Sequence, residues 1–160
     1  MEIYAFMVYL VARRKGHSMQ VTGDIWKDGK FWVVDCQTLN ASTQGRTQKE
    51  ALAMMVDWVK TMVDDSSYDI DIEMVEKRQF VMRVKNALPL VALIISRSRG
   101  ASKKTLLQLA EDIGLKSPNS IHQYEAGKHD TGIARLNELL DAMGFDLNIS
   151  VTRRGHSDVA

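Results

Sequence analysis

The first clear hydrophobic pattern in the chain is a pair of apolar-rich runs joined by a turn signal. Residues 19–27 and 30–36 flank Asp28-Gly29, and both of these turn residues tolerate the positive φ that a tight hairpin requires. The second run is rich in strand-forming residues, and a further short strand is expected at 41–45. The pattern therefore predicts an antiparallel hairpin that continues into a third strand.

The hydrophobic repeat then changes from that of a strand to that of a helix. Thr47 and Glu50 have the spacing of a capping box, and apolar residues at helical spacing follow to about position 63. Apolar and polar residues alternate again in 70–74 and 80–84, which predicts two more strands. Together these elements predict a small antiparallel sheet with one helix packed on it, as part of an α+β fold.

Helical spacing dominates the second half of the chain, and caps and glycines set the expected helix ends. The expected helices are 86–99 ended by Gly100, 102–113 with Ser102 as its N-cap, a short helix from Pro118 capped by Ser117 and ended by Gly127, and 133–143 ended by Gly144. The segment 145–151 alternates apolar and polar residues and predicts a terminal strand. A lone strand needs a partner, so we expect it to pair with its copy in a homodimer or to fold back on the first half. Residues 152–160 are expected to form a flexible tail.

Composition excludes several classes of protein. Of 160 residues, 45% are hydrophobic and 26% are charged, which is ordinary for a globular protein with a buried core. The single cysteine, Cys36, excludes an intrachain disulfide framework, and the four histidines show no metal spacing. No apolar run approaches the ~20 residues that span a bilayer, and the first apolar stretch precedes its basic residues, unlike a signal peptide. We therefore expect a cytoplasmic protein without membrane contact, metal or cofactor.

Charge is distributed unevenly, although the net charge is only +1. Seven acids lie between Asp57 and Glu76, where Lys60 is the only base. Between Arg97 and Lys128, six bases outnumber three acids. Either run alone is most simply a solvated surface, but the asymmetry between them indicates one basic partner and one anionic partner.

The second half also carries a motif of apolar residues and glycines, formed by Leu109, Ala110, Ile113, Gly114, Leu115, Ile121, Tyr124, Glu125 and Gly127. This motif resembles the helix-turn-helix of the Xre family, which includes the phage lambda-type repressors. The interval between Gly114 and Ile121 is one residue longer than the commonest spacing in that family. The resemblance implies a helical DNA-binding domain over residues 85–151, with the expected terminal strand at its end.

The expected recognition helix presents small polar side chains at its start. Asn119 and Gln123 can each contact adenine through two hydrogen bonds, and Ser120, like Ser117 at the cap, suits many bases. The lysines expected at the flanking phosphates are Lys103, Lys104, Lys116 and Lys128. We expect these residues to bind operator DNA, although the same side chains could serve only to cap and solubilise the helix.

The first half carries a second motif, in the runs 29–35 and 43–52. These runs resemble the antitoxin domain of HicA–HicB toxin–antitoxin pairs, and the resemblance covers about residues 19–84. The family residues that the chain keeps are Gly45, Thr47, Glu50 and Ala51. The chain departs from the family at 39–42, where Leu-Asn-Ala-Ser replaces the usual proline-glycine turn. The resemblance implies a partial ribonuclease H-like sheet without the catalytic residues, so the protein is not expected to be an enzyme.

Together the two resemblances imply a HicB-type antitoxin that represses its own operon. Its partner would be a small HicA-like ribonuclease toxin that cuts mRNA, and the antitoxin would act as a homodimer or higher homo-oligomer. Family toxins are basic, so the expected contact residues are the acids Asp35, Asp64, Asp65, Asp69 and Asp71. Either the acidic run or the hairpin around Asp35 could cover the toxin's catalytic face, and the sequence leaves both open.

Two other functions also stay open at this level. A stand-alone Xre-family regulator would use its first half to sense a ligand or to oligomerise. A residual nuclease would need several carboxylates around two metal ions, and only Asp24 and Asp35 are expected to face each other across the hairpin. The antitoxin domain would begin near Met19, so Met19 is also a candidate for the true start of the protein. If residues 1–18 are native, their apolar stretch would add a strand or a helix to the sheet.

Overall fold

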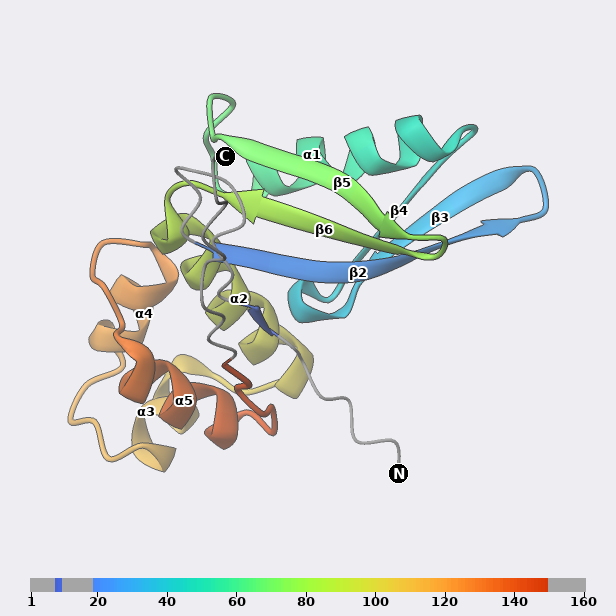
Figure 1. The fold of residues 1–160 in the computed structure, drawn as a ribbon. Helices are drawn as coiled ribbons and strands as arrows, with labels where there is room; N and C mark the ends of the chain where they lie inside the picture. Colours follow the sequence, from blue (N-terminus) through green and yellow to red (C-terminus); the bar gives the residue numbers. More distant parts are fainter. Residues whose placement is uncertain (1–7, 10–18, 150–160) are drawn as a thin grey trace, which may run out of the picture.

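The chain folds as an α+β protein in which an antiparallel sheet leads into a group of helices (Figure 1). This computed structural model describes residues 8–9 and 19–149. The strands are β1 (Val8–Tyr9), β2 (Met19–Asp28), β3 (Phe31–Cys36), β4 (Ala41–Gly45), β5 (Ile70–Glu76) and β6 (Gln79–Val84). The helices are α1 (Gln48–Met62), α2 (Ala87–Ser102), α3 (Leu106–Asp112), α4 (Asn119–Glu125) and α5 (Ile133–Ala142), and a 3-10 turn, η1 (Gln37–Leu39), joins β3 to β4. The α+β class expected from the sequence is confirmed.

The sheet has the strand order β4-β3-β2-β6-β5, and β1 also pairs with β2. All of these pairings are antiparallel. Gly29 adopts a φ of 55° in the turn between β2 and β3, and the resulting register places Asp24 directly opposite Asp35. The expected hairpin, the third strand and the two later strands are therefore confirmed. Val8–Tyr9 is the described part of the N-terminal apolar stretch, and it adds a short strand beside β2.

α1 covers one face of this sheet, and the helix begins where the capping box predicted. The Thr47 side chain accepts a hydrogen bond from the backbone N–H of Glu50 at 3.1 Å. The Glu50 carboxylate accepts a hydrogen bond from the backbone N–H of Arg46 at 2.8 Å. Met55 and Val59 are fully buried on the side of α1 that faces the sheet. The helix expected after Thr47 is therefore confirmed.

The end of α2 differs from the expectation. Gly100 does not end this helix, because α2 continues through Gly100 to Ser102 and is closed by Lys103 at a φ of 56°. Ser102 is not the N-cap of the next helix, because its hydroxyl donates a hydrogen bond back to the carbonyl of Arg99 at 2.9 Å. Thr105 is the N-cap of α3 instead. The prediction of a helix end at Gly100 was therefore wrong by about one turn.

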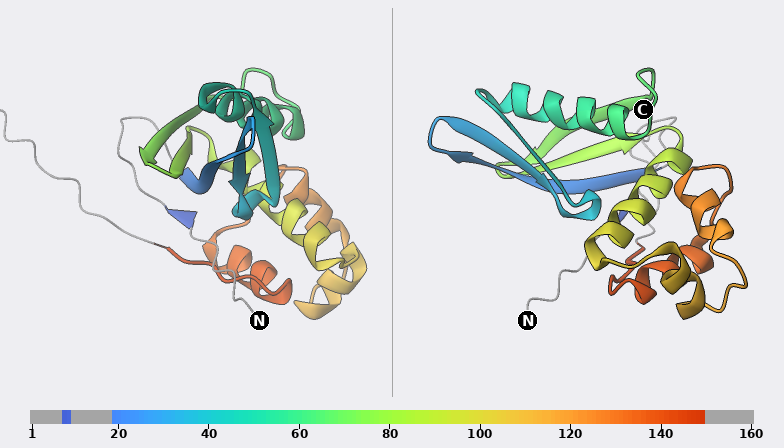
Figure 2. Two further views of the ribbon diagram at one scale, coloured as in Figure 1. Left: turned by 90° about the vertical axis from the view of Figure 1, so that its right-hand side faces the viewer. Right: turned by 180° about the vertical axis from the view of Figure 1, so that it is seen from behind.

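α2 lies between the sheet and the other helices (Figure 2). Leu90 and Ile95 are fully buried in one hydrophobic cluster that contains residues of the sheet, α1 and α5. Near the end of α2, Arg97 donates hydrogen bonds to the carbonyls of Leu39 at 3.1 Å and Asn40 at 2.6 Å. Its guanidinium carbon also lies 5.4 Å from the centre of the Trp58 ring. The cluster thus crosses the expected boundary between residues 84 and 85.

The terminal strand expected at 145–151 does not form within the described part of the chain. Residues 145–149 have no strand, and Asn148 makes only a single β-bridge. The backbone N–H of Phe145 donates to the carbonyl of Leu140 at 2.9 Å, which ties the segment to the end of α5. Phe145 and Leu147 are partly buried against the hydrophobic cluster, so the alternation reflects packing of one side of this segment on the core. Residues 150–160, which include the expected tail, lie outside the described residues.

None of the helices in the described ranges is long and apolar enough to cross a membrane.

Candidate nucleic-acid interface

α3 is a short helix whose start is fixed by side-chain hydrogen bonds. The Thr105 hydroxyl accepts a hydrogen bond from the backbone N–H of Gln108 at 3.1 Å, and the Gln108 side chain accepts one from the backbone N–H of Thr105 at 2.9 Å. Leu109 and Ala110 are buried, and Leu106 packs partly against the hydrophobic cluster. The reciprocal cap allows a helix of two turns to begin at a defined residue.

The turn from α3 to α4 is defined by a glycine in the left-handed region. Gly114 adopts a φ of 68°, and its N–H donates to the carbonyl of Glu111 at 3.1 Å. The N–H of Leu115 donates to the carbonyl of Ala110 at 2.8 Å, which completes a Schellman-type end to α3. These two hydrogen bonds fix the direction in which the chain leaves α3.

Ser117 and Pro118 precede α4 and take part in its start. The Ser117 hydroxyl accepts a hydrogen bond from the backbone N–H of Asn119 at 3.2 Å. Pro118 has helical angles, φ −67° and ψ −14°, and its carbonyl accepts from the N–H of His122 at 3.1 Å. α4 therefore begins at Asn119 with Pro118 as its N-cap residue, one residue later than expected, while the Ser117 hydroxyl still accepts from the first helical N–H.

α4 has one buried side and one polar side. Ile121 is fully buried in the core. Asn119 and His122 are exposed, while Ser120 and Gln123 are half-buried. The three residues expected to read bases, Asn119, Ser120 and Gln123, therefore lie within the first five residues of one helix. Of the three, Asn119 is the most exposed to solvent.

An ion pair between distant residues holds the inner side of α4 against α2. The Arg99 guanidinium donates two hydrogen bonds to the Glu125 carboxylate, at 2.6 Å and 3.0 Å. These hydrogen bonds outweigh burial and hold the pKa of Arg99 above its ordinary value. Arg99 also donates to the carbonyl of Lys104 at 3.1 Å, just before α3. One side chain thus connects α2, the start of α3 and the end of α4.

The sequence reasoning missed this ion pair, although it contained a usable signal. Glu125 comes four residues after the buried Ile121, so both lie on the inner side of α4. A carboxylate on the inner side of a helix needs a cationic partner because an unpaired buried charge is costly. That requirement predicts a basic partner but does not identify Arg99, which is 26 residues away in sequence.

The four expected phosphate-binding lysines lie around these two helices but differ in their surroundings. Lys103 is the exposed left-handed residue that closes α2, and Lys116 is exposed in the turn before α4. Lys128 is exposed just after α4. The ammonium of Lys104 lies 2.5 Å from a carboxylate oxygen of Asp112, so its charge is partly neutralised. Lys103, Lys116 and Lys128 are therefore better placed than Lys104 to add positive potential here.

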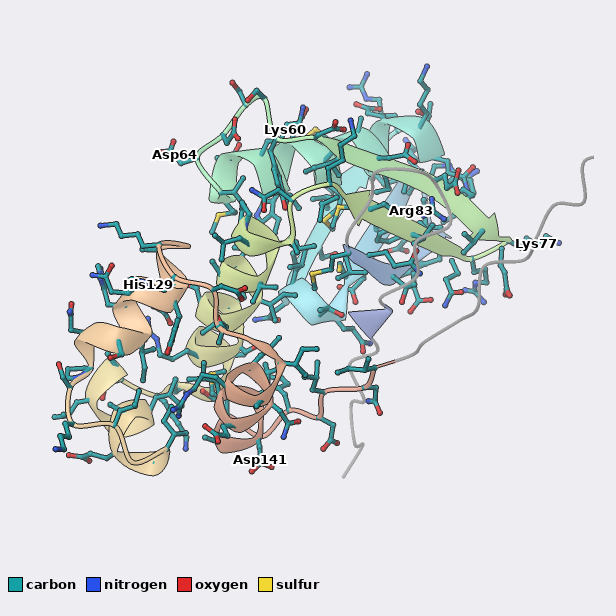
Figure 3. All side chains as sticks on the ribbon, turned by 60° about the vertical axis from the view of Figure 1, so that its left-hand side comes forward. Lys60, Asp64, Lys77, Arg83, His129 and Asp141 are labelled. Carbon is teal, nitrogen blue, oxygen red and sulfur yellow. The ribbon has the colours of Figure 1, made fainter. Side chains whose placement is uncertain are left out.

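The expected toxin-contacting acids do not form one group. Asp64 and Asp65 lie in the loop that follows α1, and Figure 3 shows the Asp64 side chain pointing outward from this loop. Asp65 accepts hydrogen bonds from the Ser67 hydroxyl at 2.6 Å and its backbone N–H at 2.8 Å, which lower the pKa of this carboxyl. Asp65 is thereby committed to the structure of its own loop.

Of the other expected acids, Asp71 and Asp35 lie on strands and Asp69 directly precedes β5. Asp69 forms an ion pair with Lys85, and a carboxylate oxygen of Asp71 lies 3.8 Å from the guanidinium of Arg83. Asp35 belongs to β3, which β2 and β6 separate from β5 in the sheet. The acidic residues therefore occupy three places: the loop after α1, the start of β5 with the residue before it, and the β2–β3 hairpin.

Asp24 and Asp35 do face each other across the hairpin, as expected. Partial burial, and to a lesser extent the charge of Asp24, raise the pKa of Asp35 above its ordinary value. Within the described ranges, no three His, Cys, Asp or Glu side chains are gathered as a metal site would require. The described residues therefore add no further carboxylate to this pair.

No family model matches the chain, and no curated protein matches it. The functional assignment therefore depends on the residues and geometry described above. Two features are available for it: the capped α3–turn–α4 unit with its polar side chains and lysines, and the carboxylates of the sheet and of the loop after α1.

Proposed function

We propose that this chain is a HicB-type antitoxin whose second half is an Xre-type helix-turn-helix. In this proposal the second half binds operator DNA and represses the chain's own operon. The first half, a partial ribonuclease H-like sheet, binds and neutralises a small HicA-like ribonuclease toxin that cuts mRNA. The observation that carries the proposal is the polar side of α4, which is held in place by the Arg99–Glu125 ion pair and framed by exposed lysines.

The chemistry of α4 suits direct reading of bases in a major groove. Carboxamides such as those of Asn119 and Gln123 can donate to and accept from adenine at the same time. The side chains that read bases need a backbone that does not shift, because hydrogen bonding depends steeply on distance and angle. Three features make the backbone of this unit rigid. The Gly114 turn and the Ser117 hydrogen bond fix the chain before α4, and the Arg99–Glu125 ion pair fixes the end of α4.

The lysines support binding to the phosphate backbone on either side of α4. Lys116 precedes the helix and Lys128 follows it, so both can reach phosphates that flank a groove occupied by α4. A homodimer would present two copies of α4 to half-sites about 34 Å apart, which is one turn of B-DNA. Binding of this kind is expected to weaken as salt rises, because each lysine–phosphate contact releases counterions.

DNA reading is tested by substitution on α4. Asn119→Ala and Gln123→Ala are each expected to cost about 1–3 kcal/mol of operator affinity, or roughly 5- to 150-fold in Kd, and to relax base preference at one position. Gln44→Ala is the matched control, because Gln44 is an exposed carboxamide on β4 in the sheet. Fluorescence anisotropy on operator and scrambled duplexes measures both effects. Equal losses for Gln44→Ala and Asn119→Ala would contradict the assignment of α4.

Toxin neutralisation is tested by co-expression with the small toxin gene that the proposal places beside this one. A stable complex that restores growth to cells expressing the neighbour would support the antitoxin function. Asn119→Ala should leave that rescue intact, because the proposal assigns neutralisation to the other half of the chain. DNA binding without any partner would instead favour the alternative of a stand-alone Xre-family regulator with a sensing or oligomerising first half.

A further inference from the structure

One face of the β2–β3 hairpin carries no helix or strand among the described residues. α1 covers the face that contains Ile25 and Val34, and side chains at alternate positions point to the opposite face. The pairing of β2 with β6 ends at Asp24, so the hairpin extends beyond β6. Figure 1 and the right-hand view of Figure 2 show this hairpin projecting away from α3, α4 and α5.

This second face of the hairpin, on which the described residues place no helix or strand, is unusually apolar. Trp26 lies directly opposite Val33 on it, and both are half-buried. Phe31, next along the same face, has 42% of its surface exposed. The solvent side of an antiparallel sheet is normally polar, whereas aromatic residues are enriched where proteins bind one another.

Two carboxylates adjoin these aromatic residues on the same face. Asp24 and Asp35 are directly opposite, an arrangement that destabilises a sheet because the like charges repel. Burial, and to a lesser extent the Asp24 carboxylate, raise the pKa of Asp35, and among the described residues no ion pair to a base is found at either carboxylate. The two lysines of the hairpin lie elsewhere, since Lys27 is on the α1 face opposite Trp32 and Lys30 is in the turn itself.

We propose that this face of the hairpin, defined by Asp24, Trp26, Phe31, Val33 and Asp35, is the surface that binds a basic protein partner. An arginine or lysine of the partner would lie between the two carboxylates, and its aliphatic part would pack against Trp26. The proposal rests on the antitoxin function proposed above and selects the hairpin over the acidic loop and β5 as the toxin-binding surface.

Charge decides among the possible occupants of this face. DNA is excluded because its phosphates would meet two carboxylates. A second copy of the chain docked through the same face would bring four carboxylates together, which is unfavourable unless all are paired. A cation relieves the repulsion between Asp24 and Asp35 directly. Elsewhere in the acidic set, Lys85 and Arg83 already lie beside Asp69 and Asp71.

The test compares two double variants that each remove two negative charges. Asp24→Asn/Asp35→Asn removes the hairpin pair, and Asp64→Asn/Asp65→Asn removes the pair in the loop after α1. Affinity for the co-purified product of the adjoining gene is measured by calorimetry at two salt concentrations. The hairpin variant is expected to bind about 10- to 100-fold more weakly with a flatter salt dependence, and the loop variant within about 2-fold of the unmodified chain.

A third variant separates the apolar contribution from folding. Phe31→Ala removes an exposed ring, so it should fold normally and still weaken binding by about 5-fold or more if Phe31 contacts the partner. Far-UV circular dichroism and operator binding check that each variant is folded. A complex that tolerates the hairpin double variant and Phe31→Ala would overturn this inference alone. Absence of any complex with the unmodified chain would overturn the proposed antitoxin function together with it.

Discussion

Asp35 illustrates at the residue scale how one carboxylate lowers the stability of the sheet. Its pKa is raised in the folded protein by burial and by Asp24, so the folded state favours the protonated form. The charge therefore costs stability at pH values above the folded pKa, and the cost disappears below the ordinary carboxyl pKa of about 3.9. Asp35→Asn is expected to raise the free energy of unfolding by about 0.2–1 kcal/mol at pH 7. Near pH 3 the variant and the native chain should unfold at the same urea concentration.

A double-variant cycle identifies the source of this effect. Asp24→Asn relieves the same repulsion, so the double variant should gain less stability than the sum of the two single variants. Urea unfolding at pH 7 measures all four proteins under one condition. An Asp35→Asn variant that is less stable than the native chain would show that the carboxylate makes a favourable contact that exceeds the repulsion.

The sequence predicted this pair because the turn sets the register. An Asp-Gly turn between two strands determines which residues face each other, so Asp24 and Asp35 could be matched by counting. No local rule connects Arg99 with Glu125, because their contact depends on how α2 and α4 cross. Residue pairs joined by a tight turn were thus predictable, and the pair that fixes the candidate DNA-reading helix was not.

At the scale of elements, two glycines that each follow an apolar helical pattern behave in opposite ways. Gly114 ends α3 at a φ of 68°, whereas Gly100 is an ordinary helical residue within α2. The rule that glycine ends helices therefore succeeded at Gly114 and failed at Gly100. The residue that closes α2 is Lys103, which adopts the left-handed conformation itself, and Thr105 then supplies the N-cap that Ser102 was expected to supply.

This difference predicts stability changes of opposite sign. Gly100→Ala should stabilise the protein by about 0.5–1 kcal/mol, because alanine loses less entropy in a helix. Gly114→Ala should destabilise it by about 1–2 kcal/mol, because a side chain strains the left-handed conformation. A Cβ at either position would meet no atom within 4 Å, so crowding contributes to neither value. Urea midpoints compare the variants, and a stabilising Gly114→Ala would contradict the observed turn.

At the scale of the whole molecule, α2 belongs to both halves of the chain. It follows β6 directly, its buried side joins the hydrophobic cluster of the sheet, and the same cluster continues into α5. Periodicity predicted that α2 exists but could not show what it packs against. The same limit applies to the terminal segment. Alternation at 145–149 indicated one buried side, and Phe145 and Leu147 are indeed partly buried against the core, but no strand forms at 145–149.

A shared core predicts that the two halves unfold together, and Arg97 is the side chain with which to test it. All three tryptophans, Trp26, Trp32 and Trp58, belong to the first half, so their fluorescence reports on the sheet layer. Circular dichroism at 222 nm is dominated by the helices, most of which follow residue 86. Coincident urea transitions by the two probes are expected, because one cooperative core gives one transition.

Arg97→Ala should lower the free energy of unfolding by about 1–3 kcal/mol and shift both transitions equally. The substitution leaves the carbonyls of Leu39 and Asn40 without their charged donor and removes the contact with Trp58. Arg135→Ala is the matched control, because Arg135 pairs on the surface of α5 with Glu138, three residues away, and should contribute only about 0.3 kcal/mol. If Arg97→Ala separates the fluorescence and circular dichroism transitions, the halves are joined mainly by this side chain. If the transitions move together, the apolar packing of α2 is what makes the protein one cooperative unit.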